Sequence, residues 1–444
     1  MKKLLGCVVT ALIILGVVAP VSHTAVLADL DDFAGGDGSA GNPYQIADWN
    51  HLDNVRHHLY SHFILMHDLD ADTDGYATLA GDAANGGKGW QPLRAPELIF
   101  NGTFDGQGYE IRDLFIDRDD EDCIGLFGMS DSPAIIEAVG VVNADITGRD
   151  SVGALVGANW GTVSNCCATG SVTGSYGVGG LVADNPGTLT RCYCTGSVSG
   201  VDLIGGLVGT AIGGTVTCCY ASGSVTGEWF VGGLVGYIDE ATVINCYATG
   251  GASGNTHVGG LVGDMTSGTI SNSYATGNVN GGDLLGGLLG SMIGGTVTSC
   301  FWDTEASGMA TSEGGTGKNT EAMQDIATYR EQGTEGLNWP WDILPVDEGA
   351  TLPYATWNIA DGVDYPFLTF RRVEVEVKAG WNMVSAPGGL ADSANTVAEV
   401  FGNQIVAIYF WNPVTKSYNV PTVLEPNQGY WVAVTEDKTL IMRI

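Results

Sequence analysis

The chain has 444 residues and 67 glycines, about twice the usual share of roughly 7%. It carries 50 acidic and 17 basic residues, a formal net charge of -33, yet only 15% of its residues are charged and 44% are hydrophobic. The chain is too apolar for a disordered acidic tail and has too few long apolar runs for a multi-span membrane protein. Nucleic-acid binding is also disfavoured, because so acidic a chain repels phosphate.

The first 28 residues have the pattern of a secretory signal peptide. Two lysines precede an apolar run from Leu4 to about Pro20, and Val26 and Ala28 supply the -3 and -1 positions of a cleavage site. An uncleaved membrane anchor is the alternative, but the apolar run is short for a membrane span. We expect cleavage after Ala28, so that the mature chain is secreted or held at the cell surface without a membrane span.

Residues 29–100 contain a predicted helix over Trp49–Leu59, where apolar residues recur every three or four positions. An acidic loop follows. Its Asp70, Asp72 and Asp74 match the first half of an EF-hand loop, in which alternating carboxylates surround Ca²⁺. The twelfth position of that pattern is Gly81 rather than Glu, so a calcium site and a solvated acidic loop both remain open.

Between Leu155 and Phe301 the chain repeats every 26 or 27 residues. A Gly-Gly-Leu-Val-Gly-like unit recurs with its leucine at Leu155, Leu181, Leu207, Leu234, Leu261 and Leu288. A second column in the same register is Cys166, Cys192, Cys219, Cys246, Ser273 and Cys300. Beside it runs a third column, Cys167, Tyr193, Tyr220, Tyr247, Tyr274 and Phe301. Repeats of this kind indicate a chain that coils upon itself.

Each repeat predicts three short strands rich in Val, Ile and Thr, in one unit Val231–Val235, Thr242–Ala248 and Gly251–Ser253. Strands this short cannot each bury a face alone, but stacked coils bury them together. Helical periodicity is absent from the repeat. The sequence therefore predicts an all-β fold, a right-handed parallel β-helix (solenoid) over residues 101–304.

The segments on either side are predicted to close the solenoid and to follow it. Residues 29–100 form an N-terminal capping region and residues 305–372 a C-terminal cap, with a short helix that Thr320 caps and that runs over Glu321–Ile326. Residues 373–444 have less glycine and alternate in period two, as in Val373 and Val375, which predicts a small separate β domain.

These repeats resemble the GLUG motif of secreted bacterial and archaeal surface proteins. The likeness rests on the Gly-Gly-Leu-Val-Gly units and on Asn-Cys-Tyr-Ala-Thr-Gly at 245–250. It extends to a lead-in segment at 104–128 and to Phe301-Trp-Asp-Thr304 and Tyr365-Pro-Phe-Leu368. The resemblance implies a solenoid and an adhesin-like role, or a part in a larger surface protein, some of which are peptidases.

The cysteine column allows three interpretations. Adjacent coils place equivalent Cα atoms about 4.8 Å apart, within the range that a disulfide spans, and export favours oxidation. Ser273 interrupts the column, however, and buried cysteine also serves as a compact apolar residue. We favour a structural ladder of stacked thiols at Cys166, Cys192, Cys219, Cys246 and Cys300, with inter-coil disulfides as the alternative and a metal site as the least supported.

The aromatic column allows two interpretations. Strand alternation turns Tyr193, Tyr220, Tyr247, Tyr274 and Phe301 away from the side of their cysteine neighbours, hence outward. An exposed aromatic stripe there would be a ligand-binding surface for sugar rings. The alternative is that the rings stack on one another and stabilise the coils.

A catalytic site on the solenoid is not favoured. Residues 151–300 hold seven acidic residues and one base, Arg191, and three of the acids (Asp202, Glu228 and Asp283) fall at the same corner of different coils. Acid–base catalysis on sugars needs carboxylates that converge on one bond. We therefore predict a non-catalytic, adhesin-like or self-assembling surface protein, with a carbohydrate-binding or carbohydrate-active protein as the alternative. No cofactor is expected to be required, with calcium as the one candidate, and the expected partners are copies of the chain itself, cell-surface proteins or glycans.

Overall fold

The computed structural model describes residues 33–93, 99–345 and 356–368, and the six strands between residues 372 and 443. The predicted signal peptide and its cleavage site after Ala28 lie outside the described residues.

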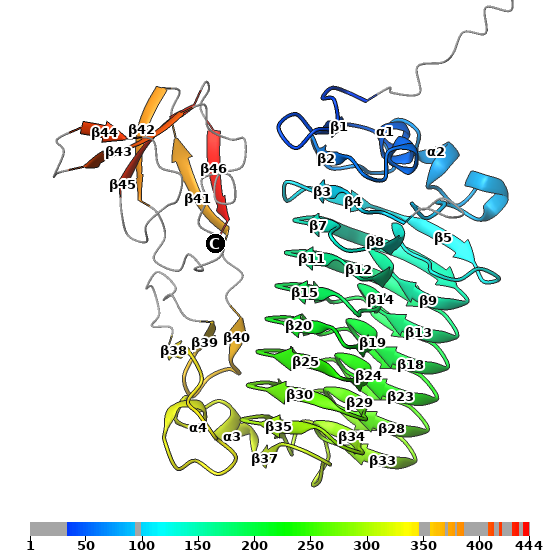
Figure 1. Ribbon diagram of the computed structural model, residues 1–444. Coiled ribbons are helices and arrows are strands. Elements are labelled where there is room, and N and C mark those ends of the chain that lie inside the picture. The colour runs from blue at the N-terminus through cyan, green and yellow to red at the C-terminus, as the bar shows by residue number, and fades with distance from the viewer. Residues whose placement is uncertain are drawn as a thin grey trace, which may run out of the picture. The chain divides into compact units, whose positions relative to one another are not determined.

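The repeats form a parallel β-solenoid, as predicted (Figure 1). Each strand pairs in parallel with the equivalent strand of the next coil, 26 or 27 residues along the chain. Thr162 pairs with Thr188, for example, and Thr188 with Thr215. Four sheets run along the solenoid, each named here by its number of strands.

The ten-stranded sheet includes two strands from the N-terminal capping region, which extend it beyond the repeats. Its strands are β1 (Tyr44–Ile46), β2 (His62–Leu65), β3 (Thr103–Asp105), β7 (Ile135–Glu137), β11 (Thr162–Ser164), β15 (Thr188–Thr190), β20 (Thr215–Thr217), β25 (Ala241–Ile244), β30 (Gly268–Ser271) and β35 (Thr296–Thr298).

The seven-stranded and six-stranded sheets lie on either side of the Gly-Gly-Leu turns. The seven-stranded sheet contains β6 (Phe127–Ser130), β10 (Val156–Asn159), β14 (Val182–Asp184), β19 (Val208–Ile212), β24 (Val235–Asp239), β29 (Val262–Met265) and β34 (Leu289–Met292). The six-stranded sheet contains β9 (Asp150–Gly153), β13 (Tyr176–Gly179), β18 (Asp202–Gly205), β23 (Trp229–Gly232), β28 (Thr256–Gly259) and β33 (Asp283–Gly286).

The fourteen-stranded sheet carries the aromatic column. Its strands are β4 (Glu110–Arg112), β5 (Phe115–Arg118), β8 (Gly140–Gly148), β12 (Cys167–Thr173), β16 (Tyr193–Cys194), β17 (Ser197–Ser199), β21 (Tyr220–Ala221), β22 (Val225–Thr226), β26 (Tyr247–Ala248), β27 (Ala252–Ser253), β31 (Tyr274–Ala275), β32 (Val279–Asn280), β36 (Phe301–Asp303) and β37 (Thr316–Lys318).

The prediction of three strands in each repeat is wrong, because sharp corners break two of them. The predicted strand Thr242–Ala248 is interrupted at Asn245, whose φ is 54°. Left-handed residues recur at the equivalent position of the other coils, at Asn165, Arg191, Cys218, Asn272 and Ser299. The predicted strand Val231–Val235 is interrupted by the Gly-Gly-Leu turn. Each corner redirects the chain into the next sheet, so that one repeat contributes to all four.

The core of the solenoid is a set of stacked columns. The six repeat leucines are fully buried, and so are inward residues of the ten-stranded sheet such as Val216 and Val243, whereas Val297 on its last strand is partly buried. Burial of one such side chain contributes about 1.5–3 kcal/mol. Because every coil repeats the same inward residues, each coil presents to the next an apolar surface that matches its own.

Glycine lets the six- and seven-stranded sheets touch backbone to backbone. A Cβ atom added to Gly205, Gly232 or Gly259 would lie 1.8 Å from a valine carbonyl oxygen. No side chain can occupy such a position. The repeated Gly-Gly-Leu-Val-Gly unit is therefore a packing requirement of the fold.

The N-terminal capping region contains the predicted helix in a shorter form. It consists of α1 (Trp49–Asn54), followed by the 3₁₀ helix η1 (Val55–His57), and the cap is completed by α2 (Tyr76–Leu79) and η2 (Ala84–Gly87). The Asp48 carboxylate caps α1 by accepting a hydrogen bond from the backbone N–H of His51 at 2.8 Å. The apolar residues that predicted the helix are buried as expected.

The C-terminal cap contains α3 (Thr320–Met323), α4 (Ala327–Arg330) and a small sheet of β38 (Ile343–Pro345), β39 (Trp357–Ile359) and β40 (Phe367–Leu368). Asn319, and not Thr320, caps α3, because the Asn319 side-chain oxygen accepts a hydrogen bond from the N–H of Ala322 at 3.0 Å. Asn is a favoured residue at this position.

Beyond the cap, the described strands pair antiparallel, unlike those of the solenoid. β41 (Arg372–Val377) pairs with β46 (Lys438–Arg443). A second sheet has the order β42 (Gly380–Ser385), β45 (Gly429–Val434), β43 (Ala407–Asn412) and β44 (Ser417–Asn419). In the described part of the chain, no helix is both long enough and apolar enough to cross a bilayer.

Candidate ligand-binding surfaces

The aromatic column of the fourteen-stranded sheet is a stack of parallel rings. The ring centroids of Tyr193 and Tyr220 are 4.9 Å apart, those of Tyr220 and Tyr247 4.8 Å, and those of Tyr247 and Tyr274 5.1 Å. The ring planes differ by 2–5°. The rings therefore stack on one another from coil to coil, as the second interpretation expects, and such stacking contributes favourably to packing.

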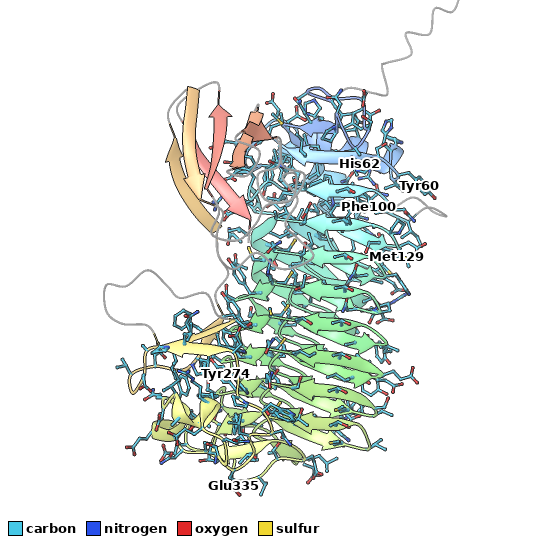
Figure 2. All side chains as sticks on the ribbon, turned by 60° about the vertical axis from the view of Figure 1, so that its left-hand side comes forward. Tyr60, His62, Phe100, Met129, Tyr274 and Glu335 are labelled. Atoms are coloured by element: carbon cyan, nitrogen blue, oxygen red, sulfur yellow. The ribbon has the colours of Figure 1, made fainter. Side chains whose placement is uncertain are left out.

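The prediction of an exposed stripe is wrong at the C-terminal end of this column. Tyr274 is 1% exposed and Phe301 is fully buried, because the C-terminal cap packs over them. Tyr274 lies next to the strands of the cap and donates a hydrogen bond to the carbonyl oxygen of Pro366 (Figure 2). The ring of Trp357 is 5.8 Å from the rings of both Tyr247 and Tyr274. A ligand on this column would therefore have only its N-terminal half to contact.

The cysteine column is a ladder of buried thiols, the favoured interpretation. Its five cysteines are free. The Cys246 thiol donates to the carbonyl oxygen of Ile244 at 3.2 Å, and the backbone N–H of Cys192 donates to the sulfur of Cys219 at 3.4 Å. Ser273 continues the same pattern, since its hydroxyl accepts from the N–H of Cys246 at 3.0 Å. Ser273 thus replaces a thiol with a hydroxyl but keeps the hydrogen bond to the preceding coil.

These thiols are expected to be inert in the folded protein. Burial raises the pKa of the Cys192 and Cys246 thiols well above the usual value and that of Cys300 to about 12, and only a thiolate is an effective nucleophile. In a titration with Ellman's reagent at about pH 8, the column thiols should not react until denaturant is added, and then all should react. Thiols that remain undetected after unfolding would show inter-coil disulfides and contradict the ladder.

The acidic loop of the N-terminal region folds around its own hydrogen bonds. The Asp70 carboxylate accepts from the Thr73 hydroxyl at 2.9 Å and from the N–H of Asp72 at 3.0 Å. The bond from Thr73 is the main cause of a lowered pKa at Asp70. No three His, Cys, Asp or Glu side chains gather as a metal-binding group anywhere in the described ranges. Asp70, Asp72 and Asp74 thus form no ready-made calcium site, and calcium binding by them stays a prediction.

The three acids at one corner of the solenoid do not converge. Asp202 pairs with Trp229 on the next coil, Trp229 with Thr256, and Thr256 with Asp283. Two other residues therefore separate the carboxylates of Asp202 and Asp283, and Glu228 lies one position outside this column. The arrangement lacks the paired carboxylates that glycoside hydrolysis requires.

The same column contains two exposed aromatic residues that sequence analysis did not single out. Tyr176 precedes Asp202 in register and is 51% exposed, and Trp229 follows Asp202 and is 45% exposed. The ring of Phe230, the residue after Trp229, packs against those of Tyr237 and His257. We call Tyr176, Asp202 and Trp229 the aromatic platform. The 26- and 27-residue spacing that aligned the acids would also have revealed these aromatic residues.

A separate hollow of about 510 Å³ lies where the seven-stranded sheet turns into the ten-stranded sheet. Trp160, which is 44% exposed, and the aligned residues Thr162, Thr188 and Thr215 line it together with several glycines. No charged side chain lines this hollow. It offers hydroxyl groups and one ring to a ligand but no charge.

Comparison with known proteins confirms the resemblance of the repeats. The family model described as the GLUG motif matches residues 229–253 and 254–280. A "putative Gly-rich membrane protein" of Evansella cellulosilytica is 36% identical over 157 residues, which cover 34% of this chain and 17% of that protein. Halomucin of Haloquadratum walsbyi is 38% identical over 146 residues, which cover 31% of this chain and 2% of that protein. The chain thus spans a small part of the length of these relatives.

A solved structure, described as a "putative immunoglobulin A1 protease" from Bacteroides ovatus, is also similar. It aligns with a TM-score of 0.45 and 22% identity over 68% of this chain and 94% of its own.

Proposed function

We propose that this protein is exported and acts at the cell surface or in the extracellular matrix as a rigid, non-catalytic, adhesin-like or self-assembling component. The observation that carries the proposal is that the recurrent residues of the repeat all have structural roles. Leucine, valine and cysteine fill the core, glycine allows backbone contact, and tyrosine stacks between coils. These positions build a long body and leave the outward positions to vary, as a scaffold requires.

Three further observations support a surface location. The matching relatives are named a Gly-rich membrane protein and a halomucin, and both are much longer than the region they share with this chain. The first residues of the chain have the composition of a signal peptide. A net charge of -33 also favours a protein that stays soluble outside the cell.

Export is tested by expressing the whole chain in a bacterial secretion host and determining the N-terminus of the recovered protein by mass spectrometry. We expect most of it outside the cytoplasm, with Asp29 as its first residue. A variant lacking residues 4–20 serves as the control and should remain inside with its N-terminal region intact. Full-length protein confined to the cytoplasm would contradict the proposal, and reducing sugar released from a polysaccharide would overturn its non-catalytic part.

A further inference from the structure

We infer that the aromatic platform binds a neutral, extended β-1,4-linked glycan chain that lies along the solenoid axis. Tyr176 and Trp229 would stack on two sugar rings, and Asp202 would accept a hydrogen bond from the hydroxyls of the sugar between them. The inference rests on the proposed function and deepens it, because it names the class of ligand that a surface protein of this kind would hold.

The spacing of the two aromatic residues is the first argument. Tyr176, Asp202 and Trp229 are in register on three successive coils, β13, β18 and β23. Coils are about 4.8 Å apart, so the two aromatic positions are about 9.6 Å apart. One residue of an extended β-1,4-linked chain spans about 5 Å, close to one coil. Successive sugars are turned over, so every second ring presents the same face, which matches aromatic residues on every second coil.

Exposure is the second argument. Tyr176 is 51% exposed and Trp229 45% exposed, although both have large apolar rings that usually find cover. Most other large aromatic residues of the repeats, including Tyr274 and Phe301, are shielded by a neighbouring ring or by the cap. The exposed rings of Tyr176 and Trp229 thus lie on one column, where the C–H groups of sugar rings can pack against them.

The polar residues of the column are the third argument. Asp202 lies between the two rings in the register and is half-buried; its Oδ1 atom is buried and, within the described residues, has no hydrogen-bond partner. Burial is also the main reason that the pKa of this carboxyl is raised. A sugar hydroxyl would reach only the exposed part of the carboxylate. Asp150 precedes Tyr176 in the register and Thr256 follows Trp229. The order of polar and aromatic residues therefore alternates coil by coil, as a chain of hydroxylated rings requires.

Phe230, which follows Trp229 in the chain, packs against two further rings. Phe230 lies 4.5 Å from the ring of His257 and 6.3 Å from that of Tyr237, measured between centroids. The hydroxyl of Tyr237 is 2.9 Å from that of Thr266. Phe230 adopts a left-handed backbone conformation, with a φ of 50°. The chain next to Trp229 is therefore held by packed side chains, and an ordered segment loses little conformational freedom when a ligand binds.

Charge distinguishes a neutral glycan from the other ligands of such a surface. The chain has a net charge of -33, and three aspartates, Asp150, Asp202 and Asp283, belong to the column itself. An anionic polysaccharide would be repelled. A neutral sugar brings hydroxyl donors for the carboxylates and apolar ring faces for Tyr176 and Trp229.

The test is calorimetric titration of the purified, exported protein with cellohexaose and with chitohexaose, and with maltohexaose as the α-1,4-linked control. We expect at least one β-1,4 hexaose to bind and maltohexaose not to bind. Affinity should rise steeply from the disaccharide to the tetrasaccharide, because two sugars cannot reach both rings. Trp229→Ala and Tyr176→Ala should each weaken binding by about tenfold or more, the loss expected for one stacked ring.

The matched control is Trp160→Ala, since Trp160 is 44% exposed and lies on another corner of the solenoid. It should leave affinity unchanged, and circular dichroism should show that all three variants are folded. Three results would overturn the inference: no binding of either β-1,4 hexaose, equal binding of maltohexaose, or loss of binding in Trp160→Ala with retention in Trp229→Ala. The last result would move the ligand to the hollow. Because export is measured separately, failure of glycan binding would leave the proposed surface location standing.

Discussion

Gly232→Ala is expected to lower the free energy of unfolding by more than about 4 kcal/mol, at the extreme of what one substitution does. The added Cβ would lie 1.8 Å from the carbonyl oxygen of Val235, 2.7 Å from its carbonyl carbon and 2.8 Å from the nitrogen of Gly263. All three are backbone atoms, so no side chain can rotate away to make room. The sheets would have to separate, and every coil stacked on this one would lose its template.

Urea denaturation followed by far-ultraviolet circular dichroism would measure the effect. Gly251→Ala is the control, because the nearest atom to its added Cβ is the carbonyl oxygen of Asn278, at 3.5 Å. That variant should stay within about 0.5 kcal/mol of the parent, or gain slightly from reduced freedom of the unfolded chain. Equal stability of the two variants would show that the six- and seven-stranded sheets are not in backbone contact.

The sequence was sufficient to predict the solenoid because residues that recur at the repeat spacing lie next to one another on adjacent coils. Residues 26 or 27 apart that keep the same chemistry, such as Cys219 and Cys246, must occupy equivalent places on adjacent coils. Ser273 could be placed in that column on spacing alone, and the structure gives it the hydrogen bond of a cysteine. In a periodic sequence, the pairing between strands of adjacent coils can therefore be inferred from the repeat spacing alone.

The corners could not be predicted in the same way. Asn245 and Asn272 adopt left-handed conformations that asparagine tolerates, but Arg191 and Cys218 hold the same conformation without any such tendency. Stacking on the neighbouring coil imposes the corner on them. The residue at the corner therefore indicates the left-handed conformation in some repeats but not in others. For this reason three strands were predicted in each repeat, whereas the structure has more.

The sequence predicted the direction of the tyrosine column correctly but not its cover by the C-terminal cap. Alternation correctly turned the tyrosines outward, but their cover comes from Trp357, which is 112 residues from its hydrogen-bond partner Asn245. No repeat carries information about such a contact. The aromatic platform, by contrast, was present in the register of Tyr176, Asp202 and Trp229, and only the emphasis on carboxylates concealed it.

Trp357→Ala is expected to release the C-terminal cap from the solenoid at a cost of about 3–5 kcal/mol. The Trp357 side chain is fully buried, and its ring lies 4.9 Å from that of Trp341 and 5.8 Å from those of Tyr247 and Tyr274. Its indole N–H donates to the side-chain oxygen of Asn245 at 3.3 Å. Alanine would leave a cavity between the cap and the tyrosine stack and would deprive Asn245 of this donor.

Limited proteolysis with mass spectrometry would show the result as new cleavage within residues 305–368, while the coils remain resistant. Trp339→Ala provides the control, because Trp339 belongs to the same cap but is 77% exposed, and it should not change the cleavage pattern. Several hydrogen bonds could hold the cap without Trp357, among them those from Tyr274 to Pro366, from Trp341 to Ser299 and from Tyr365 to Asp303. A resistant cap in Trp357→Ala would mean that these bonds suffice. Cleavage would mean that the apolar contact of Trp357 is what keeps the end of the tyrosine column covered.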